Sequence, residues 1–281
     1  GHNVYNKINI KSYFIVSSSK KILVNSIIIM LANIRRISSS FRICRTKRPL
    51  VSLNFVAPPR SEHDWILNKI CRVLDSKINS CTTRITHIDD PMPKASVHFF
   101  SHYTFYYLAL RNLQVSPTDL VYVFFTHYEP SKGITNSALI HLLKSANGVI
   151  TMNSAAESYL VESGLKNVKT VVGGADSTLF NNTKGQRDFV GLCSSYYPRK
   201  RGDLILGIVD SMPDSKFLLL GAGWDKYFRF SELIEKKNFA YLEVDYKEYP
   251  KYFEKMKVFL STSLVEGGPI PLIETMMSGA I

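Results

Sequence analysis

Short hydrophobic runs alternate with longer mixed segments along most of this chain. Apolar runs of four to eight residues between polar, glycine or proline positions are typical of buried strands. We predict strands at 50–57, 83–88, 95–100, 120–126, 148–153, 168–172, 189–193, 241–244 and 258–260, and one within 216–223 that ends in a glycine turn. Helices are predicted from Ser61 to about 74, and at 104–112, 136–146, 154–163, 203–211 and 269–278.

The order of these segments indicates the fold class. Strands that alternate with helices form a parallel sheet covered on both faces, so we predict an α/β protein. In such sheets, ligand-binding residues follow the C-terminal ends of the strands. We therefore look for functional residues in the loops that follow the predicted strands.

The last two dozen residues carry the most informative of these loops. A predicted strand at 258–260 is followed by a polar turn and by Glu-Gly-Gly-Pro, which leads into the helix at 269–278. Gly267 and Gly268 have no Cβ, so a ligand can approach the backbone there. The helix begins at Pro269 and Ile270, and its free N–H groups favour an anion. This stretch predicts a phosphate site.

Two carboxylates, Glu266 and Glu274, flank the predicted phosphate site with seven residues between them. Helical spacing puts Glu274 on the same face as Ile270 and Ser278. Carboxylates do not bind phosphate, but they accept hydrogen bonds from hydroxyl groups of a sugar or a ribose. A nucleotide sugar offers all of these groups. The alternative is an ordinary strand, loop and helix with two exposed acidic residues.

The run Glu-Gly-Gly-Pro-Ile-Pro-Leu-Ile-Glu-Thr-Met-Met-Ser-Gly, which starts at Glu266, resembles a signature of retaining glycosyltransferases. The family is the large one that includes bacterial lipopolysaccharide and capsule enzymes (group 1, or family 4, type). The resemblance implies a GT-B-like fold with two Rossmann-like parallel-sheet domains that face a cleft. It also implies transfer of a sugar from a nucleotide-sugar donor to a glycan or lipid-linked acceptor in bacterial surface polysaccharide synthesis, with retained anomeric configuration and without a metal or cofactor.

Other segments resemble the same family in the expected order. The stretches 148–157 and 171–180 are similar to the end of its first domain and to its interdomain linker. We therefore expect a basic N-terminal segment at 1–50, an acceptor-side domain at 51–180 and a nucleotide-sugar-binding domain at 181–281. The chain ends at Ile281 where the family continues, so the second domain is expected to be incomplete.

The resemblance also assigns residues of the second domain. In Pro-Arg-Lys-Arg-Gly, Lys200 and Arg201 would neutralise the donor diphosphate; the alternative is a solvated basic turn. Leu192 stands where the family has an arginine, which favours weak or absent catalysis. Glu266 would lie by the donor sugar and Glu274 would bind the ribose. Val244, assigned to donor binding, directly precedes the segment 245–254, which resembles the family's loop and helix beside the nucleotide base.

Fewer features of the first domain match. His127 follows the apolar strand at 120–125, and by resemblance it lies near the donor sugar and the acceptor. A lone histidine at a strand end is also common as a hydrogen-bonded structural residue. His98 and His102 are weaker candidates of the same kind. The first strand is followed by Pro-Pro-Arg at 58–60, where the family has glycines, so that ligand contact is in doubt.

Composition adds a basic N-terminal segment. The chain has 281 residues, 45% of them hydrophobic, and a net charge of +12. Residues 1–50 hold ten Lys or Arg and no Asp or Glu, which indicates contact with anionic lipid, nucleic acid or an acidic partner. The longest apolar run, 22–34, is shorter than the about 20 residues that a membrane-spanning helix needs. We expect a peripheral position at the inner membrane face, with Lys20, Lys21, Arg35 and Arg36 contacting lipid phosphates.

Several alternatives remain open. The run at 22–34 also fits an ordinary element of the first domain, and the acid-free start is similar in composition to a transit peptide. The four cysteines form no CxxC pair, which fits a reducing compartment such as the cytoplasm. The leading rival is a non-catalytic GT-B-like binding subunit. A nucleic-acid-binding protein ranks last, because the basic segment has few aromatic residues and no recognised motif.

Overall fold

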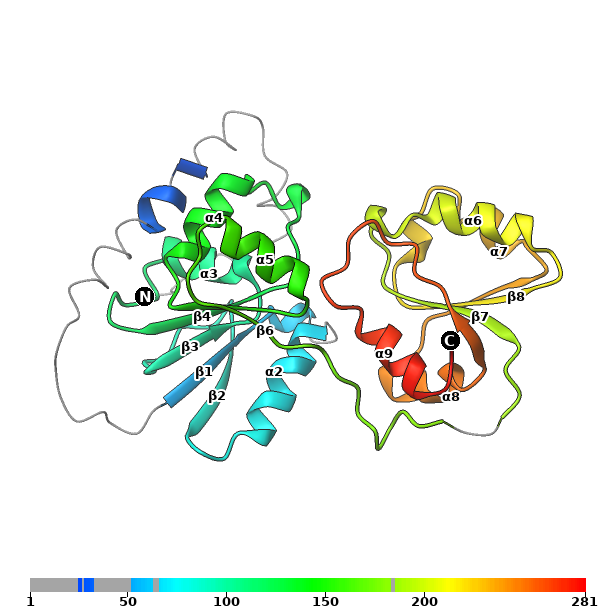
Figure 1. The fold of residues 1–281 in the computed structure, drawn as a ribbon, viewed down its shortest axis with the longest axis horizontal. Helices are drawn as coiled ribbons and strands as arrows, with labels where there is room; N and C mark the ends of the chain where they lie inside the picture. The colour runs from blue at the N-terminus through cyan, green and yellow to red at the C-terminus, as the bar shows by residue number, and fades with distance from the viewer. Residues whose placement is uncertain (1–24, 27, 33–51, 63–65, 183–184) are drawn as a thin grey trace, which may run out of the picture. The chain divides into compact units, whose positions relative to one another are not determined.

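The computed structural model describes residues 25–26, 28–32, 52–62, 66–182 and 185–281. These residues belong to two compact units, Gly1–Val171 and Val172–Ile281. Each unit has a parallel β-sheet of its own (Figure 1). Outside the described residues lie the basic residues for which a membrane contact is expected, Lys20, Lys21, Arg35 and Arg36.

The first unit contains a six-stranded sheet in the order β2-β1-β3-β4-β5-β6. All neighbouring strands pair in parallel. The order reverses beside β1, since β2 lies on one side of it and β3 on the other, as in doubly wound sheets. The strands are β1 (Ser52–Ala57), β2 (Thr82–His87), β3 (Val97–Phe100), β4 (Leu120–Phe125), β5 (Gly148–Thr151) and β6 (Val168–Thr170).

Helices cover both faces of this sheet, with α2 on one face and α3, α4 and α5 on the other (Figure 1). They are η2 (Arg60–Glu62), α2 (Ile66–Lys77), α3 (Tyr103–Arg111), η3 (Pro130–Lys132), α4 (Asn136–Lys144) and α5 (Ser154–Glu162). The side chains of His102, Thr135 and Asn153 cap the starts of α3, α4 and α5, where each accepts a hydrogen bond from a backbone N–H group. Such caps satisfy N–H groups that have no partner within the helix.

Residues 25–26 and 28–32 are helical and pack on the first unit. Ile28 and Ala32 are buried. The Asn25 side-chain oxygen accepts hydrogen bonds from the backbone N–H and the hydroxyl of Thr135, at 2.8 and 3.2 Å. For the described part of the run at 22–34, the structure therefore favours an ordinary element of the first unit.

The second unit contains a four-stranded parallel sheet in the order β10-β7-β8-β9. Its strands are β7 (Phe189–Cys193), β8 (Lys216–Leu220), β9 (Phe239–Leu242) and β10 (Met256–Phe259). Its helices are η4 (Pro198–Lys200), α6 (Gly202–Ser211), η5 (Trp224–Lys226), α7 (Phe230–Ile234), η6 (Tyr246–Glu248), α8 (Tyr249–Phe253) and α9 (Ile270–Met277).

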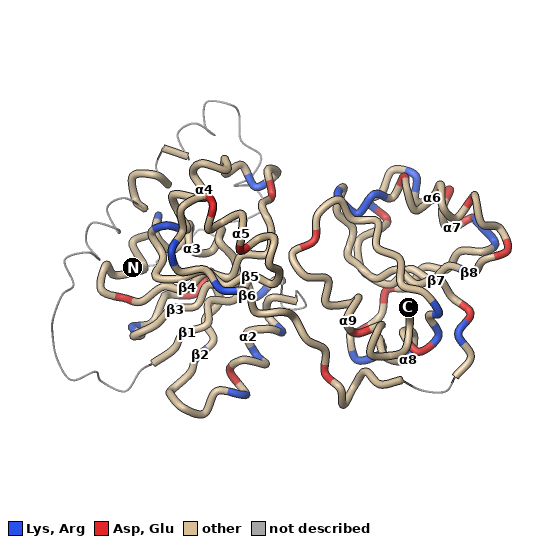
Figure 2. Tube along the Cα trace, in the orientation of Figure 1, with Lys and Arg blue, Asp and Glu red and all other residues tan. Residues whose placement is uncertain are grey.

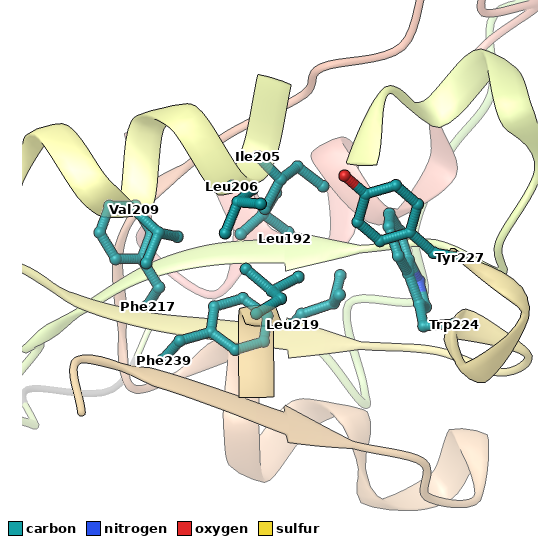
Figure 3. Close-up of a cluster of buried hydrophobic side chains, with 10 residues drawn as sticks. Leu192, Ile205, Leu206, Val209, Phe217, Leu219, Trp224, Tyr227 and Phe239 are labelled. Carbon is teal, nitrogen blue, oxygen red and sulfur yellow. The ribbon is translucent and has the colours of Figure 1, made fainter. Parts of the chain in front are cut away.

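The apolar run of β8 explains why this sheet is buried on both faces. Successive side chains of a strand point to opposite faces. Phe217 and Leu219 pack in a cluster with residues of α6 and α7 (Figure 3). Leu218 and Leu220 pack in a second cluster, with Phe253 of α8. A strand that is buried on both faces reads as a continuous hydrophobic run, as this one does.

Most predicted elements are present, with ends that differ by up to three residues. The helix predicted from Ser61 is an exception, since η2 ends at Glu62 and α2 begins at Ile66. The strand predicted at 241–244 is shifted: β9 begins at Phe239, which is buried and pairs with Phe217, and it ends at Leu242. Val244 therefore lies in the loop after β9. Phe180 is fully buried among residues of the second unit, which includes the chain from Val172 onward.

Candidate functional site

The strand order of the second unit places a candidate site at the C-terminal ends of β7 and β10. The chain runs from β7 to β8 and β9 on one side, and then returns to β10 on the other side of β7. Open α/β sheets bind ligands where the strand order reverses in this way. The loops that leave these two strands, 194–201 and 260–269, contain most of the residues that the sequence singled out.

Hydrogen bonds fasten these two loops to each other. The Leu264 backbone N–H donates to the Arg199 carbonyl at 3.0 Å. The Thr262 hydroxyl donates to the Lys200 carbonyl at 2.7 Å. The guanidinium of Arg199 donates through Nη1 to the Val265 carbonyl at 2.9 Å. The loops therefore form one frame that fixes the side chains at 199, 200 and 266.

Glu266 lies between two basic side chains in this frame. Its Oε1 accepts a hydrogen bond from Lys200 Nζ and lies 3.5 Å from Arg199 Nη1. The side chains of Lys200 and Glu266 are only 12% and 24% exposed. The Arg199 guanidinium also lies over the ring of Tyr197, 5.5 Å from its centroid. Ion pairs that are partly withdrawn from water are stronger than surface pairs.

Burial and pairing act on these two charges in different ways. Burial lowers the pKa of the Lys200 ammonium, and the hydrogen bond to Glu266 opposes that change. Burial tends to raise the pKa of Glu266, but hydrogen bonds from Lys200 and Ser263 and the charges of Lys200 and Arg199 outweigh it and lower that pKa. Glu266 is therefore an ionised acceptor at neutral pH.

Arg201 makes a different contact from the one that the sequence suggested. Its backbone is left-handed, with φ 55° and ψ 60°, at the start of α6. Its Nε and Nη2 donate to the Asp203 carboxylate at 2.9 and 2.8 Å. The structure therefore brings Lys200 and Arg199 to Glu266 and turns Arg201 to Asp203. Sequence reasoning missed Arg199, although the basic run that contains it was visible.

Glu274 is the fifth of the eight residues of α9, and only 2% of its surface is exposed. Its Oε1 accepts a hydrogen bond from the hydroxyl of Tyr246, which lies in η6. Burial and this carboxylate both raise the pKa of Tyr246. α9 has a proline in its first turn, as the sequence predicted. Because Glu274 is buried, the alternative of two exposed acidic residues is wrong.

Leu192 belongs to the hydrophobic core of the second unit. It is 3% exposed and packs against residues of α6 (Figure 3). Its place in β7 is next to Gly191, and a Cβ on Gly191 would lie 2.0 Å from Met256 Sδ. Leu192 stands where the resemblance expects an arginine, and it is part of the tightly packed core around β7.

In the first unit, His127 follows β4 and lies beside Glu129. The distance from His127 Nε2 to Glu129 Oε1 is 3.1 Å, and these side chains are 11% and 20% exposed. Lys132 Nζ lies 3.9 Å from the other carboxylate oxygen. Within the described part of the chain, neither ring nitrogen of His127 has a hydrogen bond of good geometry. His127 thus follows a strand end, as predicted, and lies beside an acidic group; its place near the donor sugar stays a prediction.

The two weaker histidine candidates have structural partners. His102 begins α3 and accepts a hydrogen bond from the Thr104 N–H at 3.3 Å. Burial lowers the pKa of His102 to about 3. His98 is buried in β3, where Nδ1 lies 3.3 Å from Asn54 Nδ2 and Nε2 lies 3.6 Å from Asp119.

Among the described residues, no group of three or more His, Cys, Asp or Glu side chains is arranged to hold a metal ion. No helix within the described ranges has the length and apolar character that crossing a membrane requires.

The sequence matches no protein-family model and no curated protein. Solved structures do resemble the fold. A point mutant of S. aureus TarM, solved with Fondaparinux, alpha-GlcNAc-glycerol and UDP, has a TM-score of 0.54 at 21% identity over 66% of this chain. The match spans only 40% of that TarM chain.

Two further structures align over more of their own length. The lipopolysaccharide outer core galactosyltransferase WaaB, in its apo form, has a TM-score of 0.54 at 10% identity and covers 82% of this chain and 79% of its own. An alpha-glucosyltransferase in complex with UDP-glucose and DNA containing an abasic site has a TM-score of 0.55 at 8% identity. The match covers 82% of this chain and 78% of the glucosyltransferase chain. With the two parallel sheets, these similarities confirm the predicted GT-B-like α/β fold.

Proposed function

We propose that this chain is a glycosyltransferase whose second unit binds a nucleotide-sugar donor. The observation that carries the proposal is the cluster of Lys200, Arg199 and Glu266 at the point where the strand order of that unit reverses. A second support is the fold, which the chain shares with glycosyltransferases solved with UDP or UDP-glucose.

The cluster has the groups that a departing nucleoside diphosphate requires. When the glycosidic bond to the donor sugar breaks, negative charge develops on the diphosphate oxygens. Lys200 and Arg199, held by the two-loop frame, stabilise that charge without needing to reorganise. The N-terminus of α9, preceded by Gly267, Gly268 and Pro269, adds a favourable dipole at Ile270.

The carboxylates and the first unit supply the remaining roles. Glu266 accepts hydrogen bonds from donor sugar hydroxyls and Glu274 from the ribose, once donor binding exposes it. Val244 lies in the loop that contacts the nucleotide base. His127 of the first unit positions or polarises the reacting sugar near the acceptor. The transfer needs no metal or cofactor and retains the anomeric configuration.

The acceptor we propose is a glycan or a lipid-linked sugar in bacterial surface polysaccharide synthesis. Of the structural neighbours, WaaB is a lipopolysaccharide galactosyltransferase, and TarM was solved with a glycerol-linked sugar. The ten basic residues of segment 1–50 suit an anionic membrane surface. The protein would then act in the cytoplasm, at the inner face of the membrane.

Turnover of nucleotide sugars tests this function. The full chain is incubated with UDP-, GDP- and dTDP-sugars, and the released nucleoside diphosphate is measured. We expect turnover of one donor class and a loss of about a hundredfold or more in Lys200→Met, because leaving-group stabilisation is removed. Arg229→Met, which breaks a surface pair with Glu232 in the same unit, is the matched control. Absence of turnover with every donor and with added glycan acceptors would overturn the proposal in favour of a non-catalytic relative.

A further inference from the structure

Two cations share one carboxylate at the candidate site. Lys200 Nζ donates to Glu266 Oε1, and Arg199 Nη1 lies 3.5 Å from the same oxygen. Two positive charges and one negative charge leave an excess of one positive charge at this point. The N-terminus of α9, which begins four residues after Glu266, adds further positive potential.

This positive excess lies in a half-buried place. The side chains of Arg199 and Glu266 are 25% and 24% exposed, and that of Lys200 is 12% exposed. Charges in such places need partners because water does not fully solvate them. An anion with two or more charges satisfies both cations better than a single carboxylate does.

Arg199 is better placed for such an anion than Arg201. Both oxygens of Asp203 already accept hydrogen bonds from Arg201. Arg199 has one strong hydrogen bond, to the Val265 carbonyl, and its contact with Glu266 is a longer one. Arg199 and Lys200 both approach the same oxygen, Glu266 Oε1, so the two cations lie on the same side of the frame.

We propose that Arg199 and Lys200 form a two-cation phosphate site, for which Glu266 is the built-in counter-ion in the unliganded protein. The phosphates of a nucleoside diphosphate replace the carboxylate, and the freed carboxylate then accepts hydroxyl groups of the donor sugar. The inference rests on the proposed function. In this proposal Arg199 supplies the positive charge toward the phosphates that the family's arginine would supply at the position of Leu192.

Titration of UDP and of inorganic pyrophosphate tests the role of Glu266. Neither ligand contains a donor sugar, so any effect of Glu266 on their affinity comes from its charge. Glu266→Gln keeps the size of the side chain and removes the competing carboxylate. We expect both ligands to bind about tenfold more tightly to Glu266→Gln than to the wild-type chain. Equal or weaker binding would overturn the counter-ion role.

Titration of the arginine variants tests the second cation. We expect Arg199→Met to weaken UDP and pyrophosphate binding by about tenfold and Arg199→Lys to recover part of that loss. Glu232→Gln and Arg229→Met, which break an exposed pair in the same unit, serve as controls for charge changes. A larger loss in Arg201→Met than in Arg199→Met would overturn the assignment. Thermal unfolding shows whether each variant is folded. If Arg199→Met is not folded, Arg199→Lys takes its place in the comparison.

The outcomes for the wild-type chain separate this inference from the proposed function. Binding of pyrophosphate without binding of UDP, GDP or dTDP would support the anion site and contradict a nucleotide-sugar donor. Binding of UDP with no gain in Glu266→Gln would leave the function standing and reject the counter-ion. Binding of neither ligand to the folded wild-type chain would reject both.

Discussion

Glu129 keeps its negative charge in a partly buried position after β4. Burial tends to raise its pKa, but the close contact with the His127 ring, 3.1 Å away, and the positive charge of Lys132 lower it to about 2. The folded state therefore holds the carboxylate in its charged form more strongly than the unfolded state does. Its contribution to stability is complete above pH 4.5, the ordinary pKa, and is lost as the pH falls toward 2.

This linkage gives a prediction for Glu129→Gln. At pH 7 the variant should be less stable than the wild-type chain, on the order of 1–2 kcal/mol, because His127 and Lys132 lose their partner. The difference should shrink steadily between about pH 4.5 and pH 2. Urea unfolding of both proteins at a series of pH values measures it. A difference that does not change over this range would show that the carboxylate charge has no stabilising role.

The charges of the candidate site show what the sequence reveals at this scale. The residue types at 200, 266 and 274 suggested a site for phosphate and hydroxyl groups, and the structure places Lys200 against Glu266. The roles assigned to these residues stay predictions. Which of three consecutive basic residues faces Glu266 depends on the 3₁₀ turn at 198–200 and on the left-handed backbone at Arg201. The sequence pattern does not show which of the three basic side chains faces Glu266, so the contact of Arg199 was not predicted.

α3 begins with an unusual cap, a buried histidine. His102 is 2% exposed, and burial lowers its pKa from 6.5 to about 3, despite the nearby charge of Glu129. The folded state holds this ring neutral, whereas the unfolded state binds a proton below pH 6.5. Its contribution to stability is therefore present above pH 6.5 and falls as the pH drops toward 3.

His102→Asn separates the cap from the titration. Asparagine is a good N-cap, so α3 should keep its hydrogen-bonded start. We expect the wild-type chain to lose stability relative to this variant between pH 6.5 and pH 3. Denaturant midpoints of the two proteins at matched pH values test this. Parallel pH profiles would contradict a neutral, buried His102.

The turn after β8 depends on Gly221. Its φ is 132°, and a Cβ there would lie 2.2 Å from the Ser194 carbonyl oxygen at the end of β7. Gly221→Ala should therefore destabilise the second unit by about 2–4 kcal/mol, through backbone strain and steric overlap. Gly207→Ala in α6 is the matched control, since nothing lies within 4 Å of the added carbon. It should be neutral or stabilising by up to about 1 kcal/mol. Equal thermal stability of the two variants would contradict the strain.

Element prediction from the sequence succeeded where the pattern was strong. The buried strands and the long helices followed from apolar runs and helical spacing. The short helices η5 and α7 were missed, because three and five residues are too few to show a helical period. The strand predicted at 241–244 begins two residues earlier in the structure, at Phe239. The sequence pattern did not show that Phe239 would be buried and paired with Phe217.

At the scale of the whole molecule, the positive charge is distributed unevenly along the chain. Of a net charge of +12, ten positive charges belong to residues 1–50, which have no acidic residue. Elsewhere basic and acidic residues are interspersed in both described units (Figure 2). The charge argument for an anionic surface therefore concerns the N-terminal segment, most of which lies outside the described residues.

Vesicle flotation tests this charge argument. We expect the wild-type chain to float with phosphatidylglycerol-containing vesicles and not with phosphatidylcholine vesicles, since each basic residue near an anionic surface adds about 1 kcal/mol. Replacement of Lys20, Lys21, Arg35 and Arg36 by glutamine should reduce flotation, and added salt should do the same. Equal flotation with both kinds of vesicle, or none with either, would remove the argument.

The α/β class and two parallel sheets could be predicted at this scale. The order of strands and helices is enough for the α/β class, because such an alternation has few compact solutions. The division into two sheets was predicted from the family resemblance. The strand order could not be predicted, since it depends on contacts between distant segments such as β7 and β10. That order makes the loops at 194–201 and 260–269 neighbours.

The central claim is that the second unit binds a nucleoside diphosphate through the cluster around Lys200. The most direct measurement is calorimetric titration of UDP, GDP and dTDP into the wild-type chain and Lys200→Met. The account predicts saturable binding of one nucleotide to the wild-type chain, a Kd about ten to a hundred times higher in Lys200→Met, and unchanged binding in Arg229→Met. No binding of any nucleotide to the folded wild-type chain, or equal binding by Lys200→Met, would contradict it.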